Sequence, residues 1–309
     1  MVASTKKKVI FVVGPTASGK SAWALEQVGR VGGSIVNIDS VQFYQRLLIG
    51  SAAPTENEKI RAPHYLYSYV DAPNEMTAGR YLKDFDQLLK SHIEFPLFVV
   101  GGTGFYIQAL EKGMFDVEPI PALYRLAIEK ELLESGPEHL YLELKSKDPD
   151  SLIHVNDHFR LVRAIEIIRH TSKIPSQMKS VPIENKNALK LPFIKVGFTF
   201  EKEEFARRVK TRTQKMVTDG LIDETKALIA EGFETWSPLA SVGYRETVEY
   251  LKSQSSIESL RLAIEQSTMQ LIKKQKTWFR RDDTILWSDH SAGTLLALQQ
   301  KIDSFLMGD

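Results

Sequence analysis

The stretch that decides the fold runs from Val9 to Ser21: VIFVV, followed by GPTASGKS. Five apolar residues ending at a glycine are typical of a buried parallel strand. The octapeptide fits the pattern G-x-x-x-x-G-K-[ST], whose glycines let successive backbone N–H groups point at one centre. Lys20 adds a positive charge, the Ser21 hydroxyl is placed to reach a Mg²⁺ ion, and the following helix offers its N-terminal dipole. The residues predicted to hold phosphate are Gly14, Pro15, Thr16, Ala17, Ser18, Gly19, Lys20 and Ser21.

Outward from this loop, strands, glycine turns and helices alternate. The predicted strands are Val9–Val13, Ser34–Asp39, Leu66–Val70, Leu97–Val100, Phe193–Phe200 and Thr284–Trp287. The predicted helices are Ser21–Arg30, Ala78–Ile93, Lys202–Thr218, Asp223–Ala230, Ile257–Arg281 and a terminal helix. This alternation predicts an α/β fold with a P-loop-type, doubly wound parallel sheet, whose ligands lie at the carboxyl ends of the strands.

The alternation stops in the middle of the chain. From Ala122 to Lys173 the sequence is helical only, and Ser180–Pro192 is a polar stretch with two prolines that predicts a linker. We therefore predict a small all-helical domain, residues 118–192, inserted into an α/β core made of residues 1–117 and 193–309.

The composition limits the classes of function. The 309 residues are 43% hydrophobic and 26% charged, and 40 Lys and Arg against 39 Asp and Glu leave a net charge of +1. This balance argues against a generally basic nucleic-acid binder, so any such binding has to come from local patches. The absence of cysteine excludes disulfides and thiolate metal sites. The apolar run before Gly14 is too short for a signal peptide or a membrane span, so we expect no membrane association and a cytoplasmic location.

The loop alone leaves its ligand open. A small-molecule kinase or an NTPase is compatible with the motif. However, no strand ends in the hydrophobic run plus Asp-Glu of a hydrolytic ATPase. No arginine-rich lid with nucleoside-kinase spacing is obvious either, although Arg207, Arg208 and Arg212 could supply one.

Several further stretches match a known family. They are Asp39–Tyr44 (DSVQFY), Ala62–His64 (APH), Gly101–Tyr106 (GGTGFY), Asn156–Glu166 (NDHFRLVRAIE), Ser241–Arg245 (SVGYR) and Lys274–Arg280 (KQKTWFR). Together with GPTASGKS, this ordered set resembles the tRNA dimethylallyltransferase family, also called tRNA isopentenyltransferases. The resemblance extends from Val9 to Trp287. With no cysteine to build a zinc finger, the chain resembles the short, bacterial type.

The resemblance implies a prenyl transfer. The enzyme moves a dimethylallyl group from dimethylallyl diphosphate to the N6 amine of the adenine 3′-adjacent to the anticodon, and releases diphosphate. The implied partners are the tRNA anticodon stem-loop and dimethylallyl diphosphate, with Mg²⁺ as cofactor and the protein as a monomer. The loop then holds a leaving diphosphate, whose developing negative charge a P-loop stabilises. The adenine amine is a weak nucleophile and needs a base to take its proton.

The resemblance also assigns roles to residues. Asp39 is the expected base; a helix N-cap or a Mg²⁺ outer-shell ligand is the alternative. Thr103 is expected near the target base, with a helix N-cap as its alternative, and Lys20 completes the catalytic set. The segments expected to contact tRNA comprise Asp39, Ser40, Val41, Gln42, Thr103, Arg125, Phe159, Arg160, Leu161, Val162, Arg163, Ser241, Val242, Gly243, Tyr244 and Arg245.

Two basic groups have both a functional and a structural interpretation. Arg208 and Arg212 are four apart on a predicted helix, which aims both guanidiniums either at the diphosphate or into ion pairs with Glu203 and Glu204. Five of the nine residues in Lys273–Arg281 are basic, which suits a helix C-terminus as well as a phosphate backbone.

Three other functions compete with tRNA prenylation. They are a small-metabolite kinase, a nucleotide-gated RNA-binding module without chemistry, and an adenylate isopentenyltransferase acting on free nucleotide. An inserted helical domain with Arg125, Arg160 and Arg163 favours tRNA, because free nucleotide needs no such arm.

Overall fold

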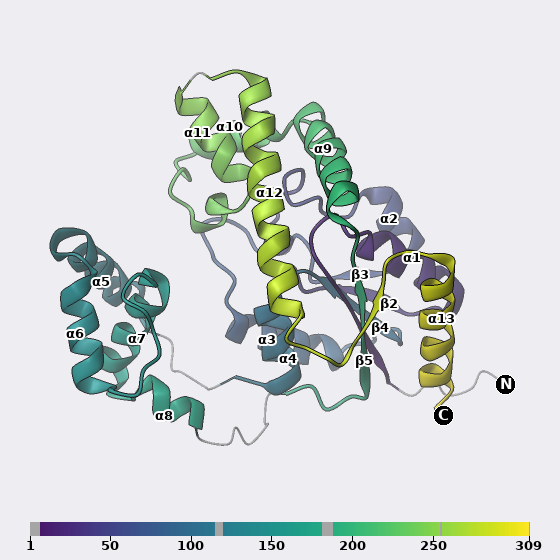
Figure 1. Cartoon of the computed structure of the whole chain (residues 1–309), viewed down its shortest axis with the longest axis horizontal. Helices are drawn as coiled ribbons and strands as arrows, with labels where there is room; N and C mark the ends of the chain where they lie inside the picture. Colours follow the sequence, from purple (N-terminus) through teal and green to yellow (C-terminus); the bar gives the residue numbers. More distant parts are fainter. Residues whose placement is uncertain (1–6, 115–119, 181–187, 254, 309) are drawn as a thin grey trace. The chain divides into compact units, whose positions relative to one another are not determined.

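The computed structural model describes residues 7–114, 120–180, 188–253 and 255–308 and contains a six-stranded parallel sheet (Figure 1). The strands are β1 (Val9–Val13), β2 (Ser34–Asn37), β3 (His64–Tyr65), β4 (Leu97–Gly101), β5 (Phe193–Phe198) and β6 (Ile285–Ser288). Their order across the sheet is β3-β2-β4-β1-β5-β6. This confirms the predicted α/β class with a parallel sheet.

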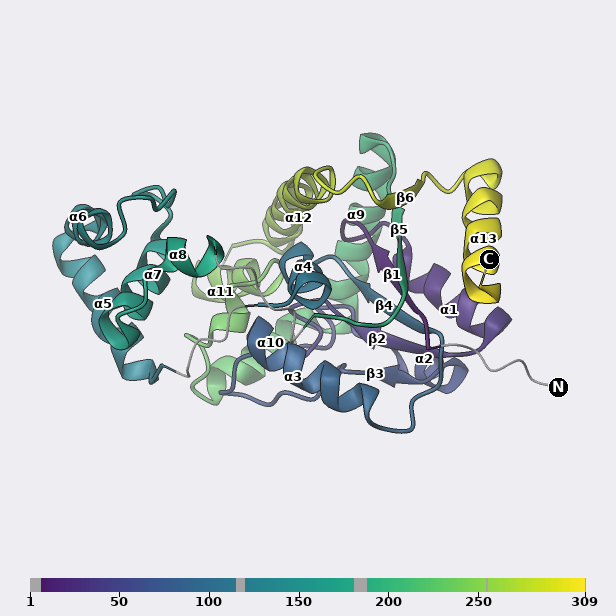
Figure 2. The ribbon, with the colours of Figure 1, turned by 90° about the horizontal axis from the view of Figure 1, so that it is seen from below.

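Helices cover both faces of this sheet. The helices of the α/β part are α1 (Lys20–Val31), α2 (Glu56–Arg61), α3 (Ala78–Leu89), α4 (Gly104–Lys112), α9 (Lys202–Asp219), α10 (Leu221–Ala230), α11 (Tyr244–Ser253), α12 (Ile257–Phe279) and α13 (Ala292–Met307). Figure 2 shows α1 and α13 on one side of the sheet and α3 and α4 on the other. No helix within the described ranges combines the length and the apolar character needed to cross a membrane.

The strand β1 is the centre of the sheet, and its sequence explains this position. All five of its residues are fully buried, and it pairs with β4 on one side and β5 on the other. Ile10 and Val12 face a core shared with Trp23 of α1 and Leu298 of α13. A strand that is apolar on both faces is stable only between two helical layers, which fixes β1 in the middle.

One predicted strand is wrong. Leu66–Val70 does not form a continuous strand. The strand β3 consists of the two residues before this range, and Val70 forms only an isolated bridge with Tyr44. Leu66 and Ser68 have φ angles of 60° and 47°. These left-handed conformations reverse the chain direction locally and prevent a continuous ladder.

The chain divides into two compact units, one of residues 1–111 and 189–309 and the other of residues 112–188. The second unit contains α5 (Ala122–Ser135), α6 (Pro137–Lys147), α7 (His158–Thr171) and α8 (Pro175–Ser180). Its core is built from Ile128, Leu140, Leu144, Leu161 and Ile165. The predicted boundary at 117 and most of the predicted linker 180–192 lie outside the described residues. Our prediction did not include α8.

Candidate active site

The carboxyl ends of three neighbouring strands carry the predicted site. The phosphate loop follows β1, Asp39 follows β2, and Thr103 follows β4, and these strands are adjacent in the order β2-β4-β1. The Thr103 hydroxyl accepts a hydrogen bond from the Ser40 backbone N–H at 3.0 Å and donates to the Ser40 hydroxyl at 3.3 Å. The parallel sheet therefore brings the segments after β2 and β4 into direct contact at its carboxyl edge.

The conformation of the phosphate loop depends on its two glycines. Gly14 has a φ of 137°, and a Cβ there would lie 2.5 Å from the Phe198 carbonyl oxygen. Gly19, with φ at 85°, precedes the first turn of α1. Lys20 is 8% exposed, and its Nζ donates to the Pro15 carbonyl at 2.9 Å. The loop is thus folded around its own lysine.

Burial perturbs the two cations beside Asp39. Removal from water lowers the pKa of Lys20 from 10.5 to about 8; the Asp39 carboxylate opposes this shift and the Arg212 guanidinium adds to it. Burial also lowers the pKa of Arg212, again opposed by Asp39. Asp39 is therefore the anion that offsets the charges of Lys20 and Arg212, and an anionic ligand would stabilise both cations further.

Hydrogen bonds within the turn fix the position of Asp39. The Asn37 side chain accepts from the Asp39 backbone N–H at 2.8 Å and donates to the Asp39 carbonyl at 3.2 Å. One oxygen of the Asp39 carboxylate accepts from the Val41 N–H at 3.2 Å. This bond belongs to a turn and involves only Oδ1. The helix N-cap alternative is wrong, because the next helix along the chain, α2, begins at Glu56. Asp39 is only partly buried.

Thr103 precedes the first turn of α4, where an N-cap residue belongs. Its carbonyl accepts from the backbone N–H groups of Tyr106 and Ile107, as at a helix start. Its hydroxyl contacts Ser40, as described above, so the side chain joins two strand ends. The backbone thus fits the helix-start interpretation, and the position of Thr103 near the target base stays a prediction.

The two arginines of α9 differ in their contacts. The Arg208 Nε donates to the Ala17 carbonyl at 2.8 Å, and the guanidinium lies 4.6 Å from the centre of the Phe200 ring. Its ion pair with Glu204 is long, 3.8 Å, because Glu204 binds Arg207 more closely. The structure therefore places Arg208 at the phosphate loop and Arg212 within electrostatic range of Lys20 and Asp39.

Gln275 of α12 joins the two glycine loops, and sequence reasoning missed it. Its side-chain oxygen accepts from the Thr16 N–H at 2.9 Å and its amide group donates to the Gly102 carbonyl at 3.0 Å. A Cβ on Gly102 would lie 2.4 Å from Nε2 of Gln275, and one on Gly104 would lie 2.0 Å from Nε1 of Trp278. No local sequence pattern distinguishes this glutamine from the basic residues around it.

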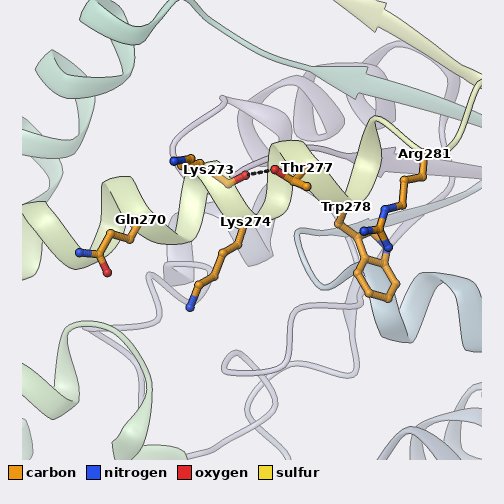
Figure 3. Close-up of a pocket in the computed structure, with 6 residues that line it drawn as sticks. All are labelled: Gln270, Lys273, Lys274, Thr277, Trp278 and Arg281. Carbon is orange, nitrogen blue, oxygen red and sulfur yellow. Dashed lines mark hydrogen bonds between the residues drawn. The ribbon is translucent and has the colours of Figure 1, made fainter. Parts of the chain in front are cut away.

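The outward face of α12 forms a basic hollow of about 450 Å³ (Figure 3). Its lining residues are Gln270, Lys273, Lys274, Thr277, Trp278 and Arg281. Three cations of the basic run therefore line this hollow, and Trp278, which also lines it, lies beside Gly104. Cations around an aromatic side chain suit a nucleic-acid strand.

Some side chains in two of the predicted tRNA-contact segments of the α/β unit are held within the fold. Tyr244 is fully buried: its hydroxyl donates to Glu224 at 2.6 Å and accepts from the Gly50 N–H at 3.0 Å. The Gln42 amide group donates to the Ser51 and Ala52 carbonyls. Both side chains therefore hold loops together. In the segment Ser241–Arg245, Gly243 is also buried and Arg245 is the exposed residue, with its guanidinium 2.5 Å from Glu246.

Within the helical unit, two of the predicted contact residues have buried side chains and a third is ion-paired. Leu161 is fully buried and Val162 is 4% exposed, both in the core, so neither side chain is available to tRNA. Arg163 pairs at 2.7 Å with Glu166, whose side chain is 4% exposed. Because a buried carboxylate needs its partner, Arg163 stabilises the fold, and its contact with tRNA stays a prediction.

The other predicted residues of this unit form one exposed cluster. The Arg125 guanidinium lies 5.4 Å from the centre of the Phe159 ring, and Phe159 is 68% exposed. Arg160 is next to it in sequence and pairs with Asp157, while Arg125 pairs with Glu129. An exposed aromatic ring beside a guanidinium, with a second exposed arginine next to it in sequence, suits stacking on bases and contact with phosphates.

A divalent cation at the loop is compatible with the side chains present. The described residues contain no cluster of three or more acidic or histidine side chains that could hold a metal on its own. Mg²⁺ commonly uses one or two protein oxygens and completes its shell with phosphate and water. The exposed Ser21 at the start of α1 and the nearby Asp39 carboxylate are oxygens of that kind.

Comparison with known families agrees with this geometry. The model of the IPP transferase family matches residues 42–282, and that of the isopentenyl transferase family matches residues 7–71. The first match includes Asp157, Thr103 and Gln275, and the second includes the phosphate loop and Asp39.

Matches to individual proteins extend over nearly the full chain. The tRNA dimethylallyltransferase of Bdellovibrio bacteriovorus is 44% identical over 292 residues, covering 93% of this chain and 95% of that protein. The crystal structure of the Bacillus halodurans tRNA isopentenylpyrophosphate transferase is similar with a TM-score of 0.68 and 27% identity, covering 98% of this chain and 97% of that one. A eukaryotic dimethylallyltransferase acting on tRNA gives a TM-score of 0.78 at 25% identity, over 98% of this chain and 80% of that one. With this match in sequence and fold, the chain belongs to the tRNA dimethylallyltransferase family.

Proposed function

We propose that the chain transfers a dimethylallyl group from dimethylallyl diphosphate to the N6 amine of the adenine 3′-adjacent to the anticodon in tRNA. The observation that carries this proposal is the grouping at one sheet edge of a phosphate loop, a carboxylate and a hydroxyl. These are Lys20 with its loop, Asp39, and Thr103 joined to Ser40. Prenyl transfer needs a site for a leaving diphosphate next to a base for an amine.

The proposed step forms a C–N bond and breaks a C–O bond. The N6 lone pair attacks C1 of the dimethylallyl group, and the electron pair of the C–O bond leaves with the diphosphate. The N6 proton passes to the Asp39 carboxylate, the positioned general base. Thr103 places the amine, because its hydroxyl lies against the residue that follows Asp39.

The leaving diphosphate is proposed to lie in the loop Gly14–Ser21. Lys20 turns from the Pro15 carbonyl to the phosphate oxygens, and Arg208 and Arg212 lie on the α9 side of the same loop. Charge that develops on the departing oxygens would thus be met by cations beside the loop, which is an effective form of electrostatic catalysis. Mg²⁺, held by Ser21 and oxygens of the diphosphate, would supply further charge neutralisation.

The tRNA is proposed to contact both units. On the α/β unit, the basic hollow of α12 and Arg245 would meet the phosphate backbone. The half-buried Ser40, Val41, Ser241 and Val242 are proposed to contact tRNA as well. On the helical unit, the cluster of Arg125, Phe159 and Arg160 would do so. The target adenine must leave the stack of the anticodon loop to reach Asp39. A tRNA substrate suits a cytoplasmic location, and we propose that the protein works as a monomer.

The test is to supply dimethylallyl diphosphate with unmodified tRNA and to follow both products. We expect one diphosphate released for each prenyl group gained by tRNA, as measured by mass spectrometry of the digested nucleosides. ATP with small metabolites tests the kinase alternative, and dimethylallyl diphosphate with free AMP tests the nucleotide prenyltransferase. Phosphate transfer from ATP, or prenylated AMP without prenylated tRNA, would overturn the proposal.

A substitution tests the cluster on the helical unit. Arg125→Ala/Arg160→Ala should weaken tRNA binding and lower the slope of log affinity against log salt by about two phosphate contacts. The affinity for dimethylallyl diphosphate should stay within twofold. Arg163 is left in place, because its removal would unpair the buried Glu166. The matched control is Lys83→Ala/Lys301→Ala, which removes two exposed cations from α3 and α13. An unchanged slope in the arginine variant would show that the cluster is only a solvated surface.

A further inference from the structure

His290 lies against the outer side of the phosphate loop, although 272 positions separate it from Ser18. Its Nε2 is 2.7 Å from the Ser18 carbonyl oxygen. Because a carbonyl only accepts hydrogen bonds, Nε2 carries the proton and donates it. His290 follows β6, so the edge strand of the sheet brings a donor back to the loop that follows the central strand β1.

Aromatic packing holds the imidazole in this orientation. The His290 ring is stacked on the Phe200 ring, with centroids 4.3 Å apart and planes 10° apart, and its centroid is 4.9 Å from that of Phe198. The Arg208 guanidinium also lies on Phe200, at 4.6 Å. Three segments, after β5, in α9 and after β6, thus form one group of side chains around Phe200.

This group binds two consecutive carbonyls of the loop. Arg208 Nε donates to the Ala17 oxygen at 2.8 Å, and His290 donates to that of Ser18. Ala17 has a φ of 61°, a left-handed conformation that a residue other than glycine adopts only when its surroundings hold it there. The two bonds, together with the packing of Ala17 against Phe205, Val209 and Ile272, hold this part of the loop.

The bond from His290 acts on the Gly19 amide. The Ser18 carbonyl and the Gly19 N–H belong to the same peptide group, so fixing the oxygen outward directs the N–H to the opposite side, where the phosphates are proposed to bind. A carbonyl that accepts a hydrogen bond also makes the N–H of its own peptide a stronger donor. Gly19 leaves the room required: a Cβ there would lie 3.1 Å from Cε1 of His290 and 3.6 Å from an Arg208 nitrogen.

The backbone at His290 is shaped for this contact. Its φ is 65°, and its N–H donates to the Ser288 hydroxyl at 3.0 Å, on a side chain that is 1% exposed. A left-handed histidine after an edge strand has no role in forming the sheet. It turns the ring back toward the loop.

We propose that His290 is a positioning residue for the diphosphate. It holds the Ser18 carbonyl outward and so keeps the Gly19 amide directed at the phosphate oxygens before the ligand arrives. The proposal rests on the proposed diphosphate site. It predicts a specific effect: loss of this donor weakens diphosphate binding and leaves tRNA binding intact.

Three variants separate the donor from the ring. His290→Phe keeps the stack on Phe200 but has no donor, His290→Gln offers an amide N–H in place of Nε2, and His290→Ala removes both. His92→Ala, at an exposed histidine, is the control. The readouts are KM for each substrate in steady state, the dissociation constant of inorganic diphosphate by calorimetry, and Tm.

For His290→Phe we expect KM for dimethylallyl diphosphate and Kd for diphosphate to rise roughly 3- to 10-fold, the range of one neutral hydrogen bond. KM for tRNA should change less than twofold, and His290→Gln should recover most of the loss. Equal diphosphate affinities in the Phe variant and the unmodified chain would overturn the proposal. The proposal would also be overturned if KM rose equally for both substrates, in parallel with a fall in Tm, and His290→Gln did not restore it. If the unmodified chain bound no diphosphate, the proposed function would fail, and the inference with it.

Discussion

Replacing Asp39 with Asn should lower the single-turnover rate of prenyl transfer roughly 10²- to 10⁴-fold, the usual contribution of a positioned general base. Asn has nearly the same size, and its side-chain oxygen can accept the Val41 N–H as Asp39 does at 3.2 Å. The turn held by Asn37 should therefore survive the change. What is lost is the ability to take a proton at neutral pH.

The measurement is prenylation with enzyme in excess over tRNA, beside a tRNA binding titration. The affinity for tRNA should change far less than the rate, because the missing interaction belongs to the transition state. Asp86→Asn on the exposed face of α3 controls for loss of one negative charge. A retained single-turnover rate would exclude Asp39 as the base, and a rate lost in proportion to binding would make it a residue that positions substrate.

Replacing Lys20 with Met should have opposite effects on activity and on stability. Loss of one charge partner of the leaving diphosphate costs about 3 kcal/mol of transition-state stabilisation, so kcat/KM for dimethylallyl diphosphate should fall at least roughly 10²-fold. The unliganded protein should nevertheless become more stable. Lys20 is 8% exposed, and burial lowers its pKa from 10.5 to about 8.

The sign of the stability effect follows from linkage. A lysine whose pKa is lower in the folded state binds fewer protons there than in the unfolded chain, so folding is disfavoured while the group is charged. At pH 7 the cost is about 3 kcal/mol at most, and it fades as the pH rises from about 8 through 10.5. Lys20→Met should therefore raise Tm by a few degrees at pH 7 and by less at pH 10. A lower Tm of Lys20→Met at pH 7 would contradict the predicted stabilisation. Unfolding could then account for the lost activity.

The sequence predicted the centre of the fold because local signals agree there. At VIFVV–GPTASGKS, an apolar run, two glycines with required conformations and a helix start all favour the same structure. The predicted β2 extends to Asp39, two residues beyond its last strand residue, Asn37. The strand ends earlier because the Asn37 side chain hydrogen-bonds to the backbone N–H and carbonyl of Asp39, which forms a turn there.

The sequence prediction failed where the backbone conformation is not evident from residue type. Val70 looks like a strand residue, but Leu66 and Ser68, just before it, have left-handed conformations that interrupt the strand. The helix α11 starts at Tyr244, whose hydroxyl is held by Glu224 and Gly50. Such partners are visible only once the chain is folded.

The same limit applies to the site. Asp39, Thr103 and the loop could be named from short motifs, because each follows directly from a strand end. Gln275 and His290 contact the loop from 259 and 272 positions away, through side chains that no local pattern distinguishes. Leu161 and Val162 show the reverse error: they lie in a matching segment, but their side chains belong to the core.

The most direct test of the account is a crystal structure of the chain with an anticodon stem-loop and an unreactive analogue of dimethylallyl diphosphate. The account predicts the diphosphate within Gly14–Ser21, in contact with Lys20. It also predicts the extruded adenine with its N6 about 3 Å from an Asp39 carboxylate oxygen, the reach of a general base. A diphosphate outside this loop, or an adenine amine with Asp39 beyond the reach of one intervening water, would contradict it.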